Sequence, residues 1–143
     1  MSTAALAPSN EVQRSKGLHI GLWVVQGLLF ALFTLAGVMK TFKPVAELAK
    51  MMSWVPRVSP EMVRFIGASE IAGALGLLLP SLTRIKPKLS SLAAAGLTTI
   101  MVLAALFHAS RGEFKVIPAN VVLGALAAFV AWGRFKGAPI APR

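Results

Sequence analysis

The chain of 143 residues contains no cysteine, no tyrosine and no aspartate. The absence of cysteine excludes disulfides, thiolate metal sites and cysteine nucleophiles within this chain. If electrons pass through such a protein, a bound cofactor or a partner must carry them. Charged residues are also scarce, at 14%, where an ordinary soluble domain has about 25%.

Apolar residues take the place of the missing charges, at 56% of the chain with a mean hydropathy of +0.72. A soluble protein of this composition would expose large apolar patches to water, so the sequence predicts a membrane protein. The net charge is +10, and most basic residues flank apolar runs, where they meet anionic lipid headgroups. No basic surface with interleaved aromatics is present, so nucleic acid is not an expected partner.

Four apolar runs of membrane-spanning character predict an all-α, integral membrane four-helix bundle. They cover residues 19–39, 62–79, 89–109 and 119–132. We expect the second run to stop at Pro80, because proline ends or kinks a helix. The chain divides into a polar N-terminal tail (1–17), a four-span membrane domain (18–135) and a basic C-terminal tail (136–143).

Residues 44–58, between the first two runs, place polar side chains at every third position and apolar ones between them. This pattern predicts a short interfacial amphipathic helix. Two interpretations remain open for it, an ordinary connecting helix over the mouth of the bundle or a lid over a site.

The orientation in the membrane follows from the basic residues, although they are nearly equal in number on the two sides. An even number of spans puts both termini on one side. The 84–88 loop on that side carries no acid, whereas the other side holds Glu47, Glu61 and Glu113. We therefore expect both termini to be cytoplasmic. Residues 1–16 lack the apolar segment of a signal peptide, so no processing is expected.

Glu70 lies in the middle of the second run, where an ionisable side chain costs a few kcal/mol unless it has a partner or a purpose. Its helical neighbours Gly67, Gly73 and Ala74 are small, so another helix or a ligand can approach that face closely. Glu70 is therefore expected to point into the bundle. It serves there either as an interhelical tie or as a group that handles protons or contacts a ligand.

Two cations lie at the ends of the first two runs, Lys40 and Arg64. Either one can pair with Glu70 or Glu61, or extend to the lipid headgroups. Asn120 opens the fourth run two residues after Pro118, and its amide either caps the helix or donates a hydrogen bond into the bundle.

His108 ends the third run, where an imidazole can exchange protons, bind a metal or haem, or form a hydrogen bond to Glu113 or Asn120. His19, the other histidine, begins the first run at the opposite face. A haem held by two histidines of one chain is therefore disfavoured, and no metal site is predicted.

Most of these polar residues fall at one membrane face, with Glu70 about two turns beneath it. The opposite half is expected to be almost wholly apolar apart from Gln26. This one-sided polarity predicts a cavity that opens toward the face on which Lys40 and His108 lie.

Several segments together carry a family resemblance. They are Leu35-Ala-Gly-Val-Met-Lys40, the stretch Arg64-Phe-Ile-Gly-Ala-Ser-Glu-Ile-Ala-Gly that continues to Pro80, His108 with Arg111-Gly-Glu113, Pro118-Ala-Asn120 and Gly133-Arg134. In these segments the sequence resembles the DoxX-like family of small four-helix membrane proteins. The resemblance implies an association with respiratory and thiol-oxidation systems, such as a membrane subunit of thiosulfate:quinone oxidoreductase. We also expect the protein in the bacterial inner membrane.

The expected function is that of a redox-associated subunit that binds a quinone or another lipophilic molecule in an intramembrane polar cavity, with or without partner subunits and self-association. The candidate catalytic residues are Glu70, His108 and Glu113, and the candidate ligand-binding residues are Lys40, Arg64 and Asn120. The alternatives are a membrane-embedded isomerase, hydrolase or cyclase with a Glu/His acid–base pair, a non-catalytic scaffold and a proton-coupled transporter. The resemblance assigns no proven role to any of these residues.

Overall fold

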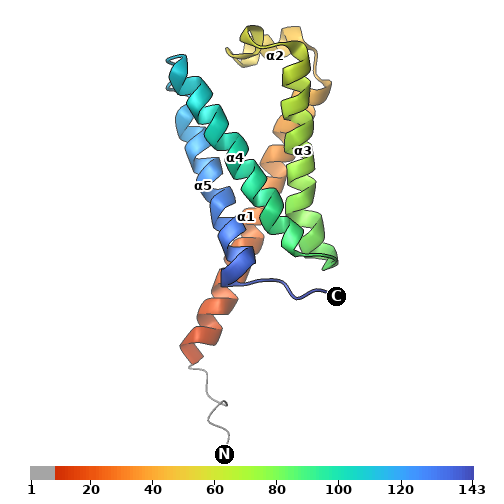
Figure 1. The fold of residues 1–143 in the computed structure, drawn as a ribbon, viewed down its shortest axis with the longest axis vertical. Coiled ribbons are helices and arrows are strands. Elements are labelled where there is room, and N and C mark those ends of the chain that lie inside the picture. The colour runs from red at the N-terminus through yellow and green to blue at the C-terminus, as the bar shows by residue number, and fades with distance from the viewer. Residues whose placement is uncertain (1–8) are drawn as a thin grey trace, which may run out of the picture.

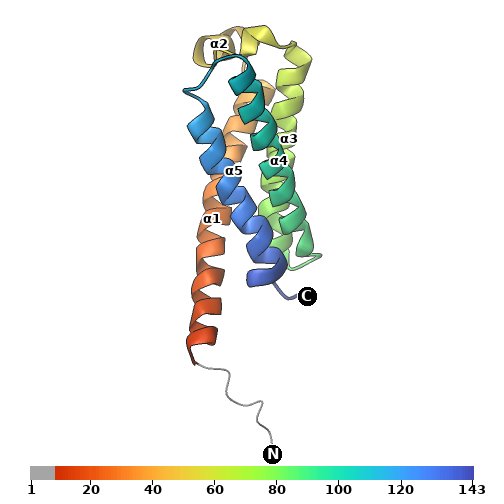
Figure 2. The same ribbon diagram turned by 60° about the vertical axis from the view of Figure 1, so that its left-hand side comes forward.

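The computed structural model describes residues 9–143, with side chains from residue 16 onward, and within that part it contains helices and no strands. The four long helices are α1 (Ser9–Phe42), α3 (Pro60–Thr83), α4 (Lys88–Ser110) and α5 (Ile117–Trp132). They run alternately up and down (Figures 1 and 2), and α5 is extended by a π-helical turn, η3 (Gly133–Gly137). Each of the four segments is long and apolar enough to span a membrane. The all-α four-span membrane bundle is thereby confirmed.

The helix boundaries differ from those predicted at two places. Helix α1 already begins at Ser9, within the predicted polar tail, and residues 1–8 of that tail lie outside the described residues. The expectation that the second span stops at Pro80 is wrong, because α3 continues to Thr83 and ends at Arg84, whose φ is 59°. The proline removes only the hydrogen bond to the carbonyl of Gly76, a loss that helices in membranes tolerate.

The segment between α1 and α3 crosses one end of the bundle as two short pieces, α2 (Val45–Met51) and the 3-10 turn η2 (Val55–Arg57). Leu48 and Val55 are buried on Val63 of α3, whereas Glu47 and Lys50 are exposed. The segment therefore has one buried and one exposed side, and its helix is shorter than the predicted residues 44–58. Its location in the membrane interface remains a prediction.

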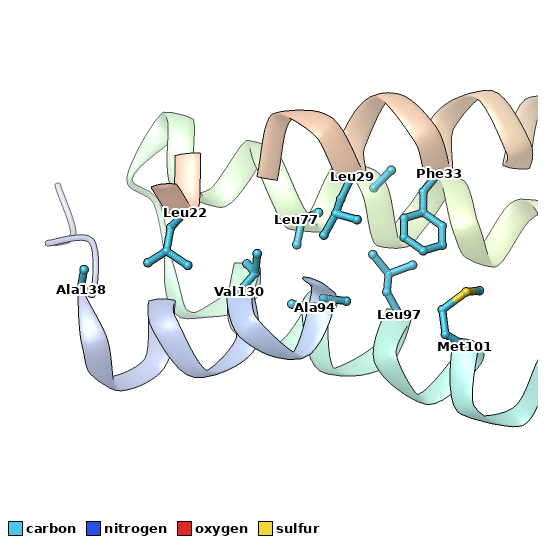
Figure 3. Packing of buried hydrophobic residues seen from close by; sticks show 11 residues of the cluster. Leu22, Leu29, Phe33, Leu77, Ala94, Leu97, Met101, Val130 and Ala138 are labelled. Carbon is cyan, nitrogen blue, oxygen red and sulfur yellow. The ribbon is translucent and has the colours of Figure 1, made fainter. Parts of the chain in front are cut away.

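The apolar core lies along the bundle axis and takes side chains from every long helix. Figure 3 shows Leu29 and Phe33 of α1 facing Leu97 of α4, with Leu77 and Val130 nearby. Most other large apolar side chains are exposed on the outside of the bundle, where a bilayer covers them.

Helices α1 and α3 meet at their backbones. A Cβ atom at Gly37 would lie 2.7 Å from the carbonyl oxygen of Gly67, and one at Gly67 would lie 2.6 Å from Thr41 Oγ1. Only glycine permits this approach, as the small neighbours of Glu70 led us to expect. The contact lies within one turn of Lys40 and Glu70 and brings those two side chains into reach of each other.

The two ends of the bundle differ in construction. At the end covered by α2, called the α2 end below, the α3–α1 pair and the α4–α5 pair diverge (Figure 1). At the other end, where α5 ends and α3 turns into α4, all four helices converge. We call it the C-terminal end. Polar side chains are buried at both ends.

Candidate functional site

The first polar group lies at the α2 end. We call it the Glu70 cluster, and its members are Lys40, Trp54, Arg64, Glu70, His108, Arg111, Glu113 and Asn120. Every candidate catalytic or ligand-binding residue predicted from the sequence lies at this end. Contacts link all of the members except Asn120, which lies in the first turn of α5. The loop and helix ends at this face bring them to one end of the molecule, as the up-and-down order of the spans requires.

Glu70 is an interhelical tie. Its Oε1 atom accepts a hydrogen bond from Lys40 Nζ at 2.6 Å, and the side chains are 2% and 13% exposed. The ammonium also lies 5.8 Å from the ring centroid of Trp54. Lys40 therefore turns into the bundle instead of extending to the headgroups, and each charge of the pair compensates the other where water is scarce.

Arg64 has a different partner from those the sequence offered. Its Nη1 atom donates to the carbonyl oxygens of Lys40 at 2.8 Å and Lys43 at 2.6 Å. These carbonyls belong to the end of α1, where the last turn lacks helical partners. Arg64 therefore caps α1 with a side chain from α3.

His108 and Glu113 lie at the end of α4. Glu113 Oε2 accepts a hydrogen bond from Ser53 Oγ at 3.0 Å, and Oε1 lies 3.2 Å from Arg111 Nε. His108 is 5% exposed, and its ring meets Trp54 edge-on with centroids 6.5 Å apart. The distance from His108 Nδ1 to Glu113 Oε1 is 3.8 Å, which is too long for a hydrogen bond. The predicted His108–Glu113 bond is therefore absent, although the two groups are close enough to attract each other.

Asn120 does not cap α5. The helix begins at Ile117 after Val116, so Asn120 lies inside its first turn, and its backbone N–H bonds to the carbonyl of Val116 at 3.4 Å. The capping prediction placed the N-cap four residues too late, at Asn120 instead of Val116. The side chain instead lines a groove of about 350 Å³ between α4 and α5, whose walls are otherwise mostly apolar.

Buried polar atoms without a hydrogen-bond partner gather in this cluster. Among the side chains that the structure describes, such atoms are His108 Nδ1, Glu113 Oε1, Asn120 Nδ2 and the hydroxyls of Thr34 and Ser91. Three of these five atoms therefore lie at the α2 end. A buried donor or acceptor that remains unpaired costs about 1–3 kcal/mol. Glu113 Oε1 is compensated by its ion pair with Arg111, which leaves His108 Nδ1 and Asn120 Nδ2 as the buried nitrogens at this end without a partner.

The second polar group was not predicted, and the expectation of an apolar opposite half is wrong. At the C-terminal end, a network that we call the Arg134 cluster joins side chains from α1, α3, α4 and η3. Its members are His19, Trp23, Gln26, Ser81, Ser90 and Arg134. Arg134, Gln26 and Ser81 are at most 3% exposed.

Gln26 is the centre of that network. Its amide nitrogen donates to the carbonyl of Leu77 at 2.7 Å and to Ser81 Oγ at 3.0 Å, and its oxygen accepts from Arg134 Nε at 2.7 Å. The sequence signal was Arg134 itself, which follows an apolar run as do the basic residues expected at the headgroups. The π-helical turn places it inside the bundle instead.

Metal-binding groups are scarce in the part of the chain that the structure describes. No three His, Cys, Asp or Glu side chains there form a group that could hold a metal ion. The two histidines lie at opposite ends, His19 beside Arg134 and His108 beside Trp54.

A protein-family model matches most of the chain. The model of the DoxX-like family matches residues 24–130. The chain belongs to the DoxX-like family. The matched range of this DoxX-like protein includes the whole Glu70 cluster, whereas His19, Trp23 and Arg134 lie outside it. Neither a curated protein nor a solved structure matches the chain.

Proposed function

We propose that this DoxX-like membrane protein binds a lipophilic molecule with carbonyl oxygens, of the quinone class, in the groove between α4 and α5. The observation that carries the proposal is the side chain of Asn120. Its Nδ2 atom is buried without a partner among the described residues, and the same side chain lines the groove.

The groove has the composition that such a ligand needs. Its walls are formed by apolar and small residues such as Met101, Ala105, Val121 and Gly124, which suit a hydrocarbon ring or tail. Thr98 also lines it, but its hydroxyl already donates to the carbonyl of Ala94 at 2.8 Å. Asn120 is therefore the one side-chain donor at this groove that is free to bind a carbonyl oxygen. The volume lies at the lower end of the range of small-molecule sites, about 300–1,000 Å³.

The neighbouring residues supply proton exchange. Ala105 lines the groove three residues before His108, so the two residues share a face of α4 and the imidazole lies one helical turn beyond the groove lining. Reduction of a quinone to a quinol takes up two electrons and two protons. His108 and Glu113 exchange the protons, and because the chain has no cysteine, a partner subunit of the redox system supplies the electrons.

Lys40, Arg64 and Glu70 have a supporting role in this proposal. Lys40 and Glu70 satisfy each other, and Arg64 is occupied by the carbonyls that end α1. These three side chains hold α1 to α3 and thereby fix the α2 end against which the ligand site is formed.

The test is quinone binding to the purified chain in phosphatidylcholine nanodiscs, measured by titration calorimetry with decylubiquinone. Asn120→Leu removes the free donor and is expected to weaken binding about ten-fold, the usual effect of one good hydrogen bond. Thr98→Val is the matched control, because it changes the same groove without removing a free donor, and it should change affinity less than about two-fold. Equal affinities of wild type and Asn120→Leu would contradict the proposal.

The close approach of His108 and Glu113 also favours a second candidate, a membrane-embedded acid–base enzyme that acts on a lipophilic substrate. The two candidates differ in what the protein needs. An enzyme of this kind turns over its substrate as the purified chain alone, whereas the redox subunit requires an electron donor.

A further inference from the structure

The Arg134 cluster contains a buried cation that has only neutral partners. Arg134 donates to Gln26 Oε1, to the carbonyl of Ala138 at 2.9 Å and to His19 Nδ1 at 2.8 Å. No acidic side chain pairs with it among the described residues, and their carboxylates, such as Glu70 and Glu113, belong to the α2 side of the molecule. A positive charge therefore remains uncompensated at the C-terminal end.

His19 adds an excess of donors to that charge. Arg134 Nη1 approaches its Nδ1 atom at 2.8 Å, and Trp23 Nε1 approaches its Nε2 atom at 3.1 Å. Arginine and tryptophan can only donate, whereas a neutral imidazole has one acceptor nitrogen and one N–H. In one of the two contacts, therefore, an N–H group of His19 faces the N–H group of its neighbour. At least one of these two N–H groups needs an acceptor from outside the network.

A pocket lies where that acceptor would enter. It measures about 340 Å³ and is lined by His19, Trp23, Ser81, Leu82, Arg84 and the irregular segment 139–141. Arg84 is held beside it because its Nε atom donates to the carbonyl of Ala141 at 2.9 Å. The other nitrogens of this guanidinium have no partner among the bonds formed within residues 16–143, so they can bind an oxyanion in the forked geometry that arginine favours.

We propose that this pocket binds the phosphate of an anionic phospholipid headgroup. Arg84 and the ring N–H groups of His19 and Trp23 donate to the phosphate oxygens, and Arg134 attracts its charge from behind His19. Leu82 and Ile140 of the same pocket provide apolar contacts for the glycerol and the first acyl carbons. A lipid is favoured over a free anion because Leu82 of α3, which lines the pocket, is exposed on the apolar outside of the bundle that a bilayer covers.

The charge around the pocket supports the same ligand. The described charged side chains at this end are all basic, namely Lys16, Arg84, Lys86, Lys88, Arg134, Lys136 and Arg143. The basic side chains therefore attract anionic lipids to this end in general. The pocket adds hydrogen-bond donors at fixed positions, which makes it a specific site.

Native mass spectrometry of the full chain tests the proposal, with phosphatidylglycerol and phosphatidylcholine of identical acyl chains added in equal amounts. We expect wild type to retain phosphatidylglycerol, and Arg84→Gln to lower its occupancy about five- to ten-fold. Lys88→Gln removes the same charge from an exposed position outside the pocket and should lower occupancy less than about two-fold. Helical content by circular dichroism verifies that both variants fold.

Three results would overturn the proposal. Equal losses in Arg84→Gln and Lys88→Gln would mean that the lipid responds only to surface charge. Equal retention of the two lipids would remove the need for an anion. Displacement of phosphatidylglycerol by excess inorganic phosphate would assign the pocket to a free anion instead of a lipid. None of these results depends on quinone binding at the other end of the bundle.

Discussion

Lys40 Nζ lies 2.6 Å from Glu70 Oε1, and this ion pair joins α1 to α3 beside the point where Gly37 and Gly67 bring the two backbones together. The two features depend on each other. Without the glycines the helices would be too far apart for a direct contact, and without the pair each charge would be buried alone.

Removing one member of that pair should destabilise the protein more than removing both. Glu70→Leu alone leaves the Lys40 ammonium uncompensated, and we expect a loss of about 3–5 kcal/mol in the free energy of unfolding. Lys40→Met combined with Glu70→Leu should recover at least half of that loss. Thermal unfolding of the single and double variants in detergent measures the coupling, and additive losses would contradict a direct pair.

The glycine contact can be tested by adding a single methyl group. Gly67→Ala places a Cβ atom against Thr41 Oγ1 and the backbone of α1, and it should destabilise the bundle by about 1–3 kcal/mol. Gly96→Ala is the matched control, because no atom lies within 4 Å of its new Cβ. It should raise stability by up to about 1 kcal/mol through helix propensity. Equal unfolding temperatures for the two variants would be incompatible with this packing.

The Arg134 cluster predicts that Gln26 is essential for stability. Gln26→Leu leaves Arg134 Nε without its partner and removes one of the two bonds of Ser81 Oγ, which keeps Ser90. It should cost about 3 kcal/mol, because the group that loses its acceptor is charged. Ser69→Ala serves as the control, since the Ser69 hydroxyl is exposed and bonds only to Phe65 of its own helix. Chemical unfolding followed by circular dichroism compares the two, and a neutral Gln26→Leu would show that the network contributes no stability.

The expectation that both termini are cytoplasmic is testable because the natural chain offers no competing thiol. Lys50→Cys places an exposed thiol at the α2 end and Lys136→Cys places one at the C-terminal end. A membrane-impermeant maleimide added to intact cells should label Lys50→Cys, and it should label Lys136→Cys only after permeabilisation. The reverse pattern would invert the topology.

The sequence was sufficient for the four spans, because membrane-spanning helices require long apolar runs that little else produces. It also indicated that Glu70 points inward, since Gly67 and Gly73 on the same face allow close packing. The partner of Glu70 was not predictable. Lys40 and Arg64 carry the same charge, so the sequence does not say which of them pairs with Glu70. The way in which α1 and α3 cross places Lys40 at the carboxylate and Arg64 at the end of α1.

The Arg134 cluster was missed for a different reason. A basic residue at the end of a span is expected at the headgroups unless the sequence offers it a carboxylate nearby, whereas burial of Arg134 depends on the π-helical turn and on Gln26, which is far away in sequence. The prediction that Asn120 caps the fourth helix was wrong because the helix starts before Pro118. A proline is accommodated at the second helical position as well as at the first.

The unequal fastening of the two ends has a mechanical consequence. At the C-terminal end, Gly133 packs directly on Leu22 and buried hydrogen bonds tie α1 and α3 to η3. At the α2 end, where Figure 1 shows the helix pairs diverging, Ser53 and Trp54 bridge to Glu113 and His108. If the α1–α3 pair rotates against the α4–α5 pair, the axis of the rotation therefore lies at the C-terminal end. Such a rotation displaces Asn120 and His108 much further than Gln26.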